Sequence, residues 1–154
     1  MSFESAYLTL RQASIWGMRR KGVKQAEIAR RMGVQRQGIN RAFMAIDSKV
    51  GKALVEAARL NKLSVYRVDL VNGILEAYSP VYKVPVIISF SEANGVQVWY
   101  LYEGKCNECE RTGTCRKVLR AEAEERNIQL SEEDNKLPPT LLARKIFSKY
   151  SEMV

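Results

Sequence analysis

Residues 24–42 read KQAEIARRMGVQRQGINRA. The apolar positions of this stretch have the spacing of two short helices packed on each other, and they are Ile28, Met32, Val34, Ile39 and Ala42. Ala29 stands where a small side chain lets two helices touch. Gly33 stands between the helices, where the chain needs a left-handed residue that glycine adopts at little cost. The stretch therefore predicts a helix over 24–32, a tight turn, and a second helix from Gln35, which is a helix-turn-helix.

The residues before this stretch predict a third helix for the same bundle. Thr9 and Gln12 have the spacing of a capping box, in which each side chain satisfies a backbone N–H of the other residue. Ile15, Trp16 and Met18 follow at helical spacing, and Gly22 ends the element. We expect a helix from Thr9 to Arg20.

The residues after the stretch extend its second helix. A narrow apolar seam recurs at steps of four and three residues, at Ile46, Val50, Ala53, Ala57 and Leu60. Two interpretations stay open for residues 44–62: the seam is the contact of a homodimer, or it packs on the protein's own sheet. The sequence predicts a linking helix in either case.

The character of the chain changes at Leu63. Alternating apolar residues predict strands before and after Asn72-Gly73, a pair typical of hairpin turns. A two-residue turn there would place Leu70 opposite Leu75 and Asp69 opposite Glu76. Residues 84–90 and 96–102 predict a second strand pair around the turn 91–95. The last strand is apolar on both faces, so we expect it to be covered on both sides.

The C-terminal part is predicted to return to helices. An amphipathic helix is expected over 117–126, a polar connection over 131–136, and a last helix after Pro138-Pro139-Thr140. The expected class is α+β: an N-terminal bundle of three to four helices with the helix-turn-helix, then a small four-stranded antiparallel sheet, a cysteine loop and C-terminal helices. We predict two domains, residues 1–62 and 63–154, the second regulatory or oligomeric.

Charge is distributed unevenly along the chain, whose formal net charge is +8. Residues 1–63 hold 13 Lys or Arg against 4 Asp or Glu, a net +9, whereas residues 64–154 hold 12 against 13, a net −1. Such a basic part favours a polyanionic partner over a role in solubility alone. The sequence has no run of about 20 apolar residues and does not begin like a signal peptide, so we expect a cytoplasmic protein without membrane contact.

The second helix of the motif carries side chains that can read bases. Arginine can bridge two acceptors of guanine, and asparagine or glutamine can pair with adenine; the candidates are Gln35, Arg36, Gln37, Asn40 and Arg41. Neighbouring cations are candidates for phosphate contacts: Arg19, Arg20, Lys21, Lys24, Arg30 and Arg31. The alternatives are RNA or another acidic partner, and a basic face that only contacts solvent.

These residues also carry a resemblance. The pattern is Leu8-Thr9-x-Arg11-Gln12, then Ile15-Trp16, Gly22 and Glu27-Ile28-Ala29-x-x-Met32-Gly33-Val34. It resembles the helix-turn-helix of LuxR-type regulators, of sigma-factor promoter-reading regions and, most closely, of archaeal Tfx-type DNA-binding proteins. The resemblance covers residues 7–62 and implies a cytoplasmic transcription regulator. Lys24 and Gln35 depart from it, because such domains often have Ser or Thr there, and Gly38 is a costly residue inside a helix.

Three cysteines, Cys106, Cys109 and Cys115, have a spacing that favours a metal site. Zinc would need a fourth ligand, such as Glu108, Glu110, water or a second subunit, and an iron–sulfur cluster usually takes four cysteines. The alternatives are inert cysteines and redox-active thiols, because cations flank them, namely Lys105, Arg111, Arg116 and Lys117.

Catalysis is not expected, because the chain has no histidine and no glycine-rich phosphate loop. The sequence predicts a DNA-binding transcription regulator that reads the major groove with residues 35–44, binds paired half-sites as a homodimer, and responds to a small-molecule or metal effector. The alternative is a metal- or redox-sensing protein-interaction module whose basic helical face meets RNA or an acidic protein.

Overall fold

The structure is a computed structural model that describes residues 8–102 and 106–153. Helix α1 (Leu10–Arg20) begins at the predicted capping box, where the Gln12 N–H donates to Thr9 Oγ1 and the Thr9 N–H donates to Gln12 Oε1, both at 3.1 Å. Gly22 follows the helix with a φ of 80°. The predicted first helix and both of its end signals are confirmed.

The next two helices form the expected pair. Helix α2 (Gln25–Met32) ends at Gly33, which has the left-handed φ of 66° that the turn requires. Helix α3 (Arg36–Leu60) then runs for 25 residues without a break. Ile28 and Ile39 are fully buried between the helices. Lys24 and Gln35 form no side-chain cap, although the Gln25 amide donates to the Arg36 carbonyl at 3.2 Å and ties the start of α2 to the start of α3.

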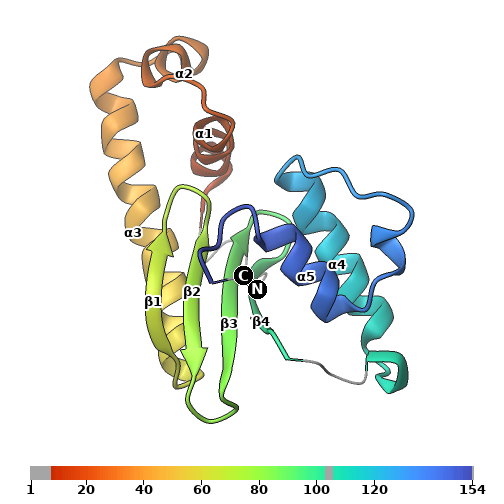
Figure 1. Ribbon diagram of the computed structural model, residues 1–154. Coiled ribbons are helices and arrows are strands. Elements are labelled where there is room, and N and C mark those ends of the chain that lie inside the picture. Colours follow the sequence, from red (N-terminus) through yellow and green to blue (C-terminus); the bar gives the residue numbers. More distant parts are fainter. Residues whose placement is uncertain (1–7, 103–105, 154) are drawn as a thin grey trace.

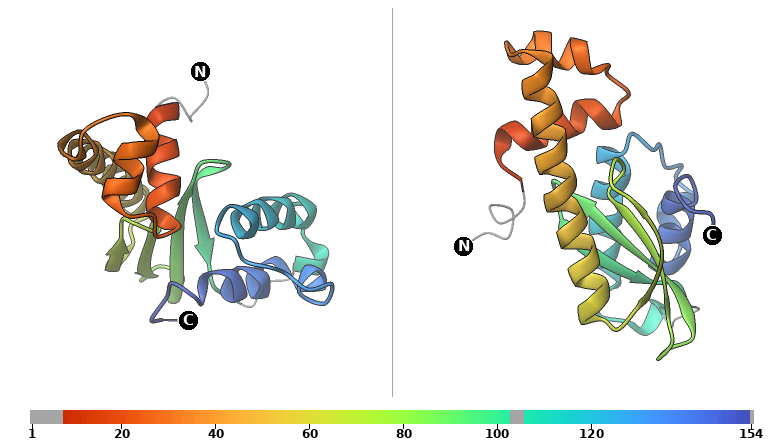
Figure 2. Two further views of the ribbon diagram at one scale, coloured as in Figure 1. Left: turned by 90° about the horizontal axis from the view of Figure 1, so that it is seen from above. Right: turned by 90° about the vertical axis from the view of Figure 1, so that its left-hand side faces the viewer.

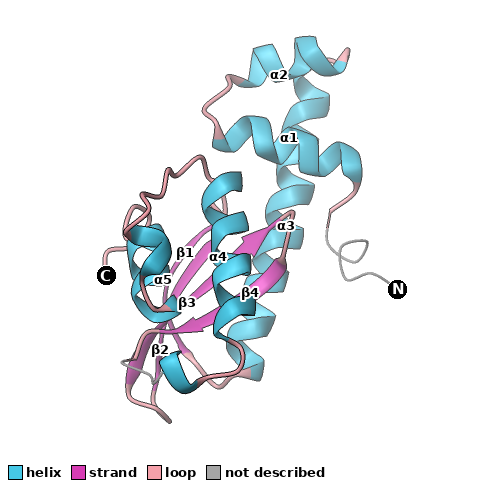
Figure 3. Ribbon diagram, turned by 90° about the vertical axis from the view of Figure 1, so that its right-hand side faces the viewer, coloured by secondary structure: helices cyan, strands magenta, loops and turns pink. Residues whose placement is uncertain are grey.

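The strands form one antiparallel sheet in the order β1 (Ser64–Asp69), β2 (Ile74–Ser79), β3 (Val84–Ser91) and β4 (Gly95–Tyr100). Helix α3 lies along one face of the sheet, and α4 (Thr112–Glu125) and α5 (Pro139–Phe147) lie on the other (Figures 1, 2 and 3). Two short 3-10 turns, Cys106–Glu108 and Asp134–Lys136, complete this part. The predicted α+β class is confirmed. Helix α4 begins five residues before the predicted position 117.

The predicted register of the first hairpin is wrong. Asp69 pairs with Ile74, so the turn contains four residues instead of two, and Glu76 lies opposite Arg67. The Asp69 carboxylate stabilises the longer turn by accepting hydrogen bonds from the Asn72 N–H at 3.1 Å and from its side-chain amide at 2.8 Å. This register also replaces a repulsive pair of carboxylates by an attractive cross-strand pair, in which Arg67 Nε lies 2.7 Å from Glu76 Oε2.

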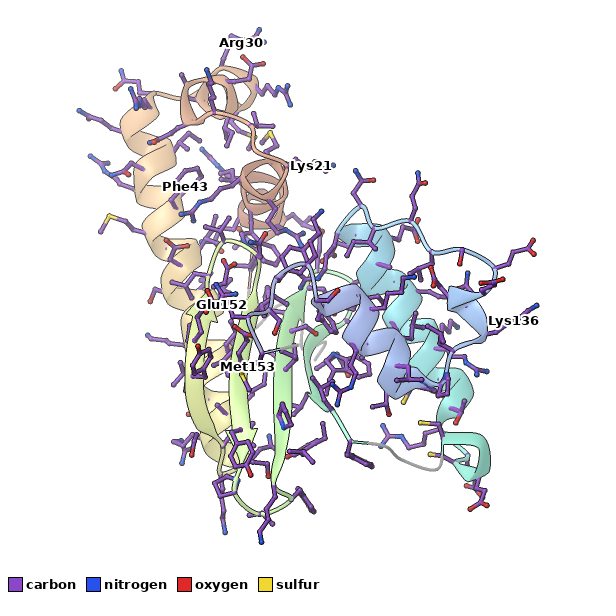
Figure 4. All side chains as sticks on the ribbon, viewed as in Figure 1. Lys21, Arg30, Phe43, Lys136, Glu152 and Met153 are labelled. Carbon is purple, nitrogen blue, oxygen red and sulfur yellow. The ribbon has the colours of Figure 1, made fainter. Side chains whose placement is uncertain are left out.

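Glu76 also holds the C-terminal segment. Its buried Oε1 accepts hydrogen bonds from the backbone N–H groups of Glu152 at 2.9 Å and Met153 at 3.2 Å, and from the Ser151 hydroxyl. Burial alone would raise the pKa of Glu76, but these hydrogen bonds and Arg67 lower it further than burial raises it. The segment 151–153 therefore lies on the same face of the sheet as α4 and α5, next to β1 and β2 (Figure 4).

Two hydrophobic clusters flank the sheet. The first joins the three N-terminal helices to the sheet, and its fully buried members include Trp16, Ile46, Val50 and Leu54. The seam of α3 therefore packs mainly on the protein's own sheet, although Leu60 stays 67% exposed. The second cluster joins the other face to α4 and α5 through Ile87, Leu119 and Phe147, among others. Strand β4 contributes to both clusters, so its predicted double coverage is confirmed.

Within residues 8–102 and 106–153, no helix is both long enough and apolar enough to span a membrane.

The helix-turn-helix meets the sheet at a close contact between α1 and the first hairpin. The Trp16 ring packs edge-on against Phe90, with 5.2 Å between ring centroids. Gly73 lies against both residues: a Cβ at this position would be 2.7 Å from the Phe90 carbonyl oxygen and 2.9 Å from Trp16 Cζ2. Gly73 also has a left-handed φ of 66°. Only glycine fits this contact.

Gly73→Ala should therefore lower the free energy of unfolding by at least about 2 kcal/mol, through backbone strain and overpacking. Urea denaturation followed by circular dichroism measures the change. Gly113→Ala is the matched control, because a Cβ at Gly113 meets nothing within 4 Å. Equal denaturation midpoints for Gly73→Ala and the unsubstituted protein would show that the turn does not pack tightly on Trp16.

Candidate nucleic-acid interface

The first turns of α3 present a polar row to solvent. Its five members are all exposed, and no other described residue forms a hydrogen bond or an ion pair with their side chains; they are Gln35, Arg36, Gln37, Asn40 and Arg41. The opposite side of the same turns carries Ile39, which is fully buried. We call these five residues the α3 polar row. Packing on one side fixes the helix, while the row remains available to a partner.

The α3 polar row lies at one end of the molecule. Helix α3 extends beyond the sheet, and α1 and α2 pack against this projecting half (Figures 1 and 2). Arg30 marks the outer end of α2, and Phe43 lies between α3 and α1 (Figure 4). The row is thus carried by a protruding helix that three-helix packing holds in place. A single α-helix has the width that the major groove of B-DNA admits.

The cations of α2 are grouped around one carboxylate. Arg30 Nε lies 2.8 Å and Arg31 Nε 3.0 Å from the carboxylate of Glu27. Hydrogen bonds from Arg30 and Arg31 lower the pKa of Glu27 to about 2, so the group of three carries a net charge of +1 at neutral pH. Lys24, just before α2, is exposed and has no carboxylate partner among the residues described. These positions bring positive charge beside the α3 polar row.

Arg19 and Arg20 face the interior instead. Arg19 is bonded to Asp47 at 2.7 Å, and its guanidinium lies 4.4 Å from the centre of the Phe43 ring, so it joins α1 to α3. Arg20 lies 3.8 Å from the centre of the Trp16 ring and 3.3 Å from the Glu125 carboxylate. A flat guanidinium stacks well on an aromatic ring, and here both arginines are engaged by rings and carboxylates of the protein itself.

Two residues near the interface escaped the sequence-based prediction. Gln25 fixes the start of α3 through its bond to the Arg36 carbonyl, and Glu27 orients the two arginines of α2. The spacing of Glu27 three and four residues before Arg30 and Arg31 is a signal that could have indicated this pairing. The contact of Gln25 crosses the turn and has no comparable sequence signal.

The three cysteines line one pocket of about 320 Å³ between β4 and the helices α4 and α5. Cys106 and Cys115 are half-buried and Cys109 is exposed, and Trp99 and Arg111 lie in the same wall. Burial raises the pKa of the Cys115 thiol, and Arg111 opposes this only in part. The thiol form is therefore favoured at Cys115, which weakens the expectation that the cations flanking the cysteines generate a thiolate there. Lys105 lies outside the described residues.

The fit of this donor set to a metal is limited. Within residues 8–102 and 106–153, the structure brings no group of three or more Cys, Asp, Glu or His side chains into an arrangement that could hold a metal ion. Cys106 Sγ lies instead 3.5 Å from the Thr140 hydroxyl. Zinc or an iron–sulfur cluster at Cys106, Cys109 and Cys115 therefore stays a prediction from their spacing.

Metal analysis of protein purified without added zinc tests that prediction. If the spacing reflects a metal site, zinc or iron should copurify at about one equivalent per chain, because thiolate sites release such ions slowly and bind them tightly. A Cys109→Ser variant is the control for a specific site. A content below about a tenth of an equivalent would reject the metal interpretation.

No family model, no curated protein and no solved structure matches this chain.

Proposed function

We propose that the chain is a sequence-specific DNA-binding regulator of transcription that reads the major groove with residues 35–44. The observation that carries this proposal is the α3 polar row: exposed Arg, Asn and Gln side chains on a protruding helix, without partners among the described residues. Their donors and acceptors match the base edges of guanine and adenine. A transcription regulator of this kind acts in the cytoplasm and needs no membrane contact.

The cations around the row would set its position on the duplex. Lys24, Arg30 and Arg31 are exposed and lie on or beside α2, which flanks the projecting end of α3 (Figure 4). Lys21 is exposed too, but it lines a pocket beside the end of α4 instead. Contacts of this type bind phosphates and carry no sequence information directly. Specificity would then come from Arg36, Asn40 and their neighbours.

DNA is favoured over duplex RNA by the shape of the reading element. The major groove of A-form RNA is deep and narrow, so a helix such as α3 cannot reach its base edges. A homodimer on paired half-sites remains our proposal for the assembly. Its support is a groove between α3 and β4, which Val55, Leu60 and Val96 line in part.

DNA binding should depend steeply on salt. About three phosphate contacts per chain release counterions, so affinity should fall by roughly 40-fold between about 50 and 200 mM salt. Fluorescence anisotropy with a labelled duplex measures the slope. Lys24→Gln should reduce the slope by about one, whereas Lys136→Gln, on the far side of the molecule (Figure 4), should leave it unchanged. A flat response to salt would contradict the proposed phosphate contacts.

A further inference from the structure

A positively charged pocket lies between the end of α1 and the C-terminal ends of α4 and α5. Its volume is about 520 Å³, within the range of small-molecule sites. The walls come from the end of α1, the first hairpin turn, the end of α4 and the segment after α5. We call it the junction pocket. These four segments are far apart in the sequence, and only the fold brings them together (Figure 1).

Cations dominate the lining of the junction pocket. Arg20 and Lys21 come from α1, Arg126 follows α4, and Lys149 follows α5, whereas Glu125 is the acidic residue among the lining side chains. Glu125 is already engaged, because its carboxylate accepts a hydrogen bond from Arg20 at 3.3 Å. It also accepts hydrogen bonds from the backbone N–H groups of Glu92 and Ala93, after β3, at 3.1 Å each. The lining therefore carries a net charge of +3.

The carboxylate of Glu122, which is buried behind Arg126, offsets part of this positive charge. Glu122 is fully buried and its Oε2 lies 3.0 Å from Arg126 Nε. With Glu122 included, the charge around the pocket is still +2. Arg126 donates its remaining groups to backbone carbonyls of Asn72 and Phe90, so the wall is rigid. A rigid, cationic and concave surface is suited to an anion.

An unsatisfied donor lies in the same wall. The side chain of Arg20 is only 10% exposed, and its Nε is buried without a hydrogen-bond acceptor among the described residues. A buried donor without an acceptor is costly. Because this nitrogen is closed to solvent, Arg20 contributes its charge to the pocket rather than this donor. Asn72, Asn127 and Tyr150 add polar groups to the lining that could orient a bound anion.

We propose that the junction pocket binds a small phosphorylated molecule that acts as the effector of the DNA-binding helices. Arg20, Lys21 and Lys149 would contact its phosphate oxygens. Such a ligand would bridge α1, which belongs to the helix-turn-helix bundle, and the segment after α5, so it would favour the arrangement that brings both together. The binding site stands on the pocket alone, whereas the effect on DNA rests on the proposed function.

Isothermal titration of the whole 154-residue chain with inorganic pyrophosphate, at constant ionic strength, tests the site. Pyrophosphate should bind, and Lys149→Gln and Lys21→Gln should each weaken it by about tenfold, because each variant loses a charged contact. Lys136→Gln, which removes an exposed lysine far from the pocket (Figure 4), should leave the affinity unchanged. No binding, or equal affinity in all four proteins, would overturn the proposal.

A second measurement separates a free phosphate from the phosphates of DNA. Pyrophosphate should change DNA affinity by about 5- to 150-fold, the range of typical allosteric coupling, and Lys149→Gln should abolish this change without altering DNA affinity when pyrophosphate is absent. If Lys149→Gln weakens DNA binding by itself and pyrophosphate has no effect, the pocket is a DNA contact and the effector proposal is wrong. Pyrophosphate binding in a protein that binds no DNA would retain the site and overturn the regulator.

Discussion

The double variant Arg36→Ala/Asn40→Ala should lose specific DNA binding and keep the stability of the unsubstituted protein. Both side chains are exposed and have no partner among the described residues, so their removal leaves no buried group unsatisfied. Ile39, which holds this part of α3 in place, is unchanged and fully buried. Alanine also favours the helix at both positions.

The expected loss follows from the contacts that the two residues can make. A good bidentate contact to a base is worth about 1–3 kcal/mol, so two such contacts contribute about 2–6 kcal/mol. Affinity for the preferred duplex should therefore fall by at least about 30-fold. Binding to unrelated duplexes should remain, because the cations at Lys24, Arg30 and Arg31 still contact phosphates.

Arg120→Ala/Gln129→Ala is the matched control for this variant. It also removes one cation and one amide from exposed positions, but in and just after α4, away from the α3 polar row. The control should keep full affinity for the preferred duplex in the anisotropy assay. The same affinity in both double variants would refute the assignment of residues 35–44 as the reading element.

Glu122→Ala should lower the free energy of unfolding by about 3–5 kcal/mol, because it leaves the charge of Arg126 buried and unpaired. The two side chains of this pair are at most 1% exposed. Glu122 also accepts a hydrogen bond from the Ser89 hydroxyl at 3.2 Å, and that hydroxyl accepts one from Trp99 Nε1 at 3.1 Å. One substitution therefore disturbs a network that joins α4 to β3 and β4.

Chemical denaturation measures this loss, and Glu124→Ala is its control. Glu124 lies on the same helix but is exposed, so its removal should change stability by less than about 0.5 kcal/mol. If Glu122→Ala is as stable as Glu124→Ala, the pair with Arg126 does not hold α4 on the sheet. The junction pocket would then lack the rigid wall that Arg126 provides.

The elements that the sequence predicts well are those with local signals. The capping box at Thr9, the left-handed turn at Gly33 and the strand alternation after Leu63 each depend on a few adjacent residues, and the structure confirms them. The register of the first hairpin fails because Asn72-Gly73 is compatible with two turn lengths. The choice between them depends on Asp69 as a turn cap and on Arg67 facing Glu76.

At the candidate interface, too, local features could be predicted from the sequence and long-range contacts could not. The exposed side of α3 follows from helical spacing, and so the α3 polar row could be named from the sequence. The different roles of Arg20 and Lys24 could not, because Arg20 meets Trp16 and Glu125, and Glu125 lies 105 residues further along the chain. The junction pocket is likewise beyond sequence reasoning, since Lys21 and Lys149 come together only in the folded chain.

Selection of bound duplexes from a random DNA pool by the whole 154-residue chain is the most direct test of DNA reading by α3. We expect a short sequence motif to be enriched, with paired half-sites if the protein binds as a homodimer, and we expect Arg36→Ala/Asn40→Ala to enrich none. Selection in the presence of a chelator would show whether metal at the cysteines affects binding. A pool that stays random with the unsubstituted protein would contradict the account.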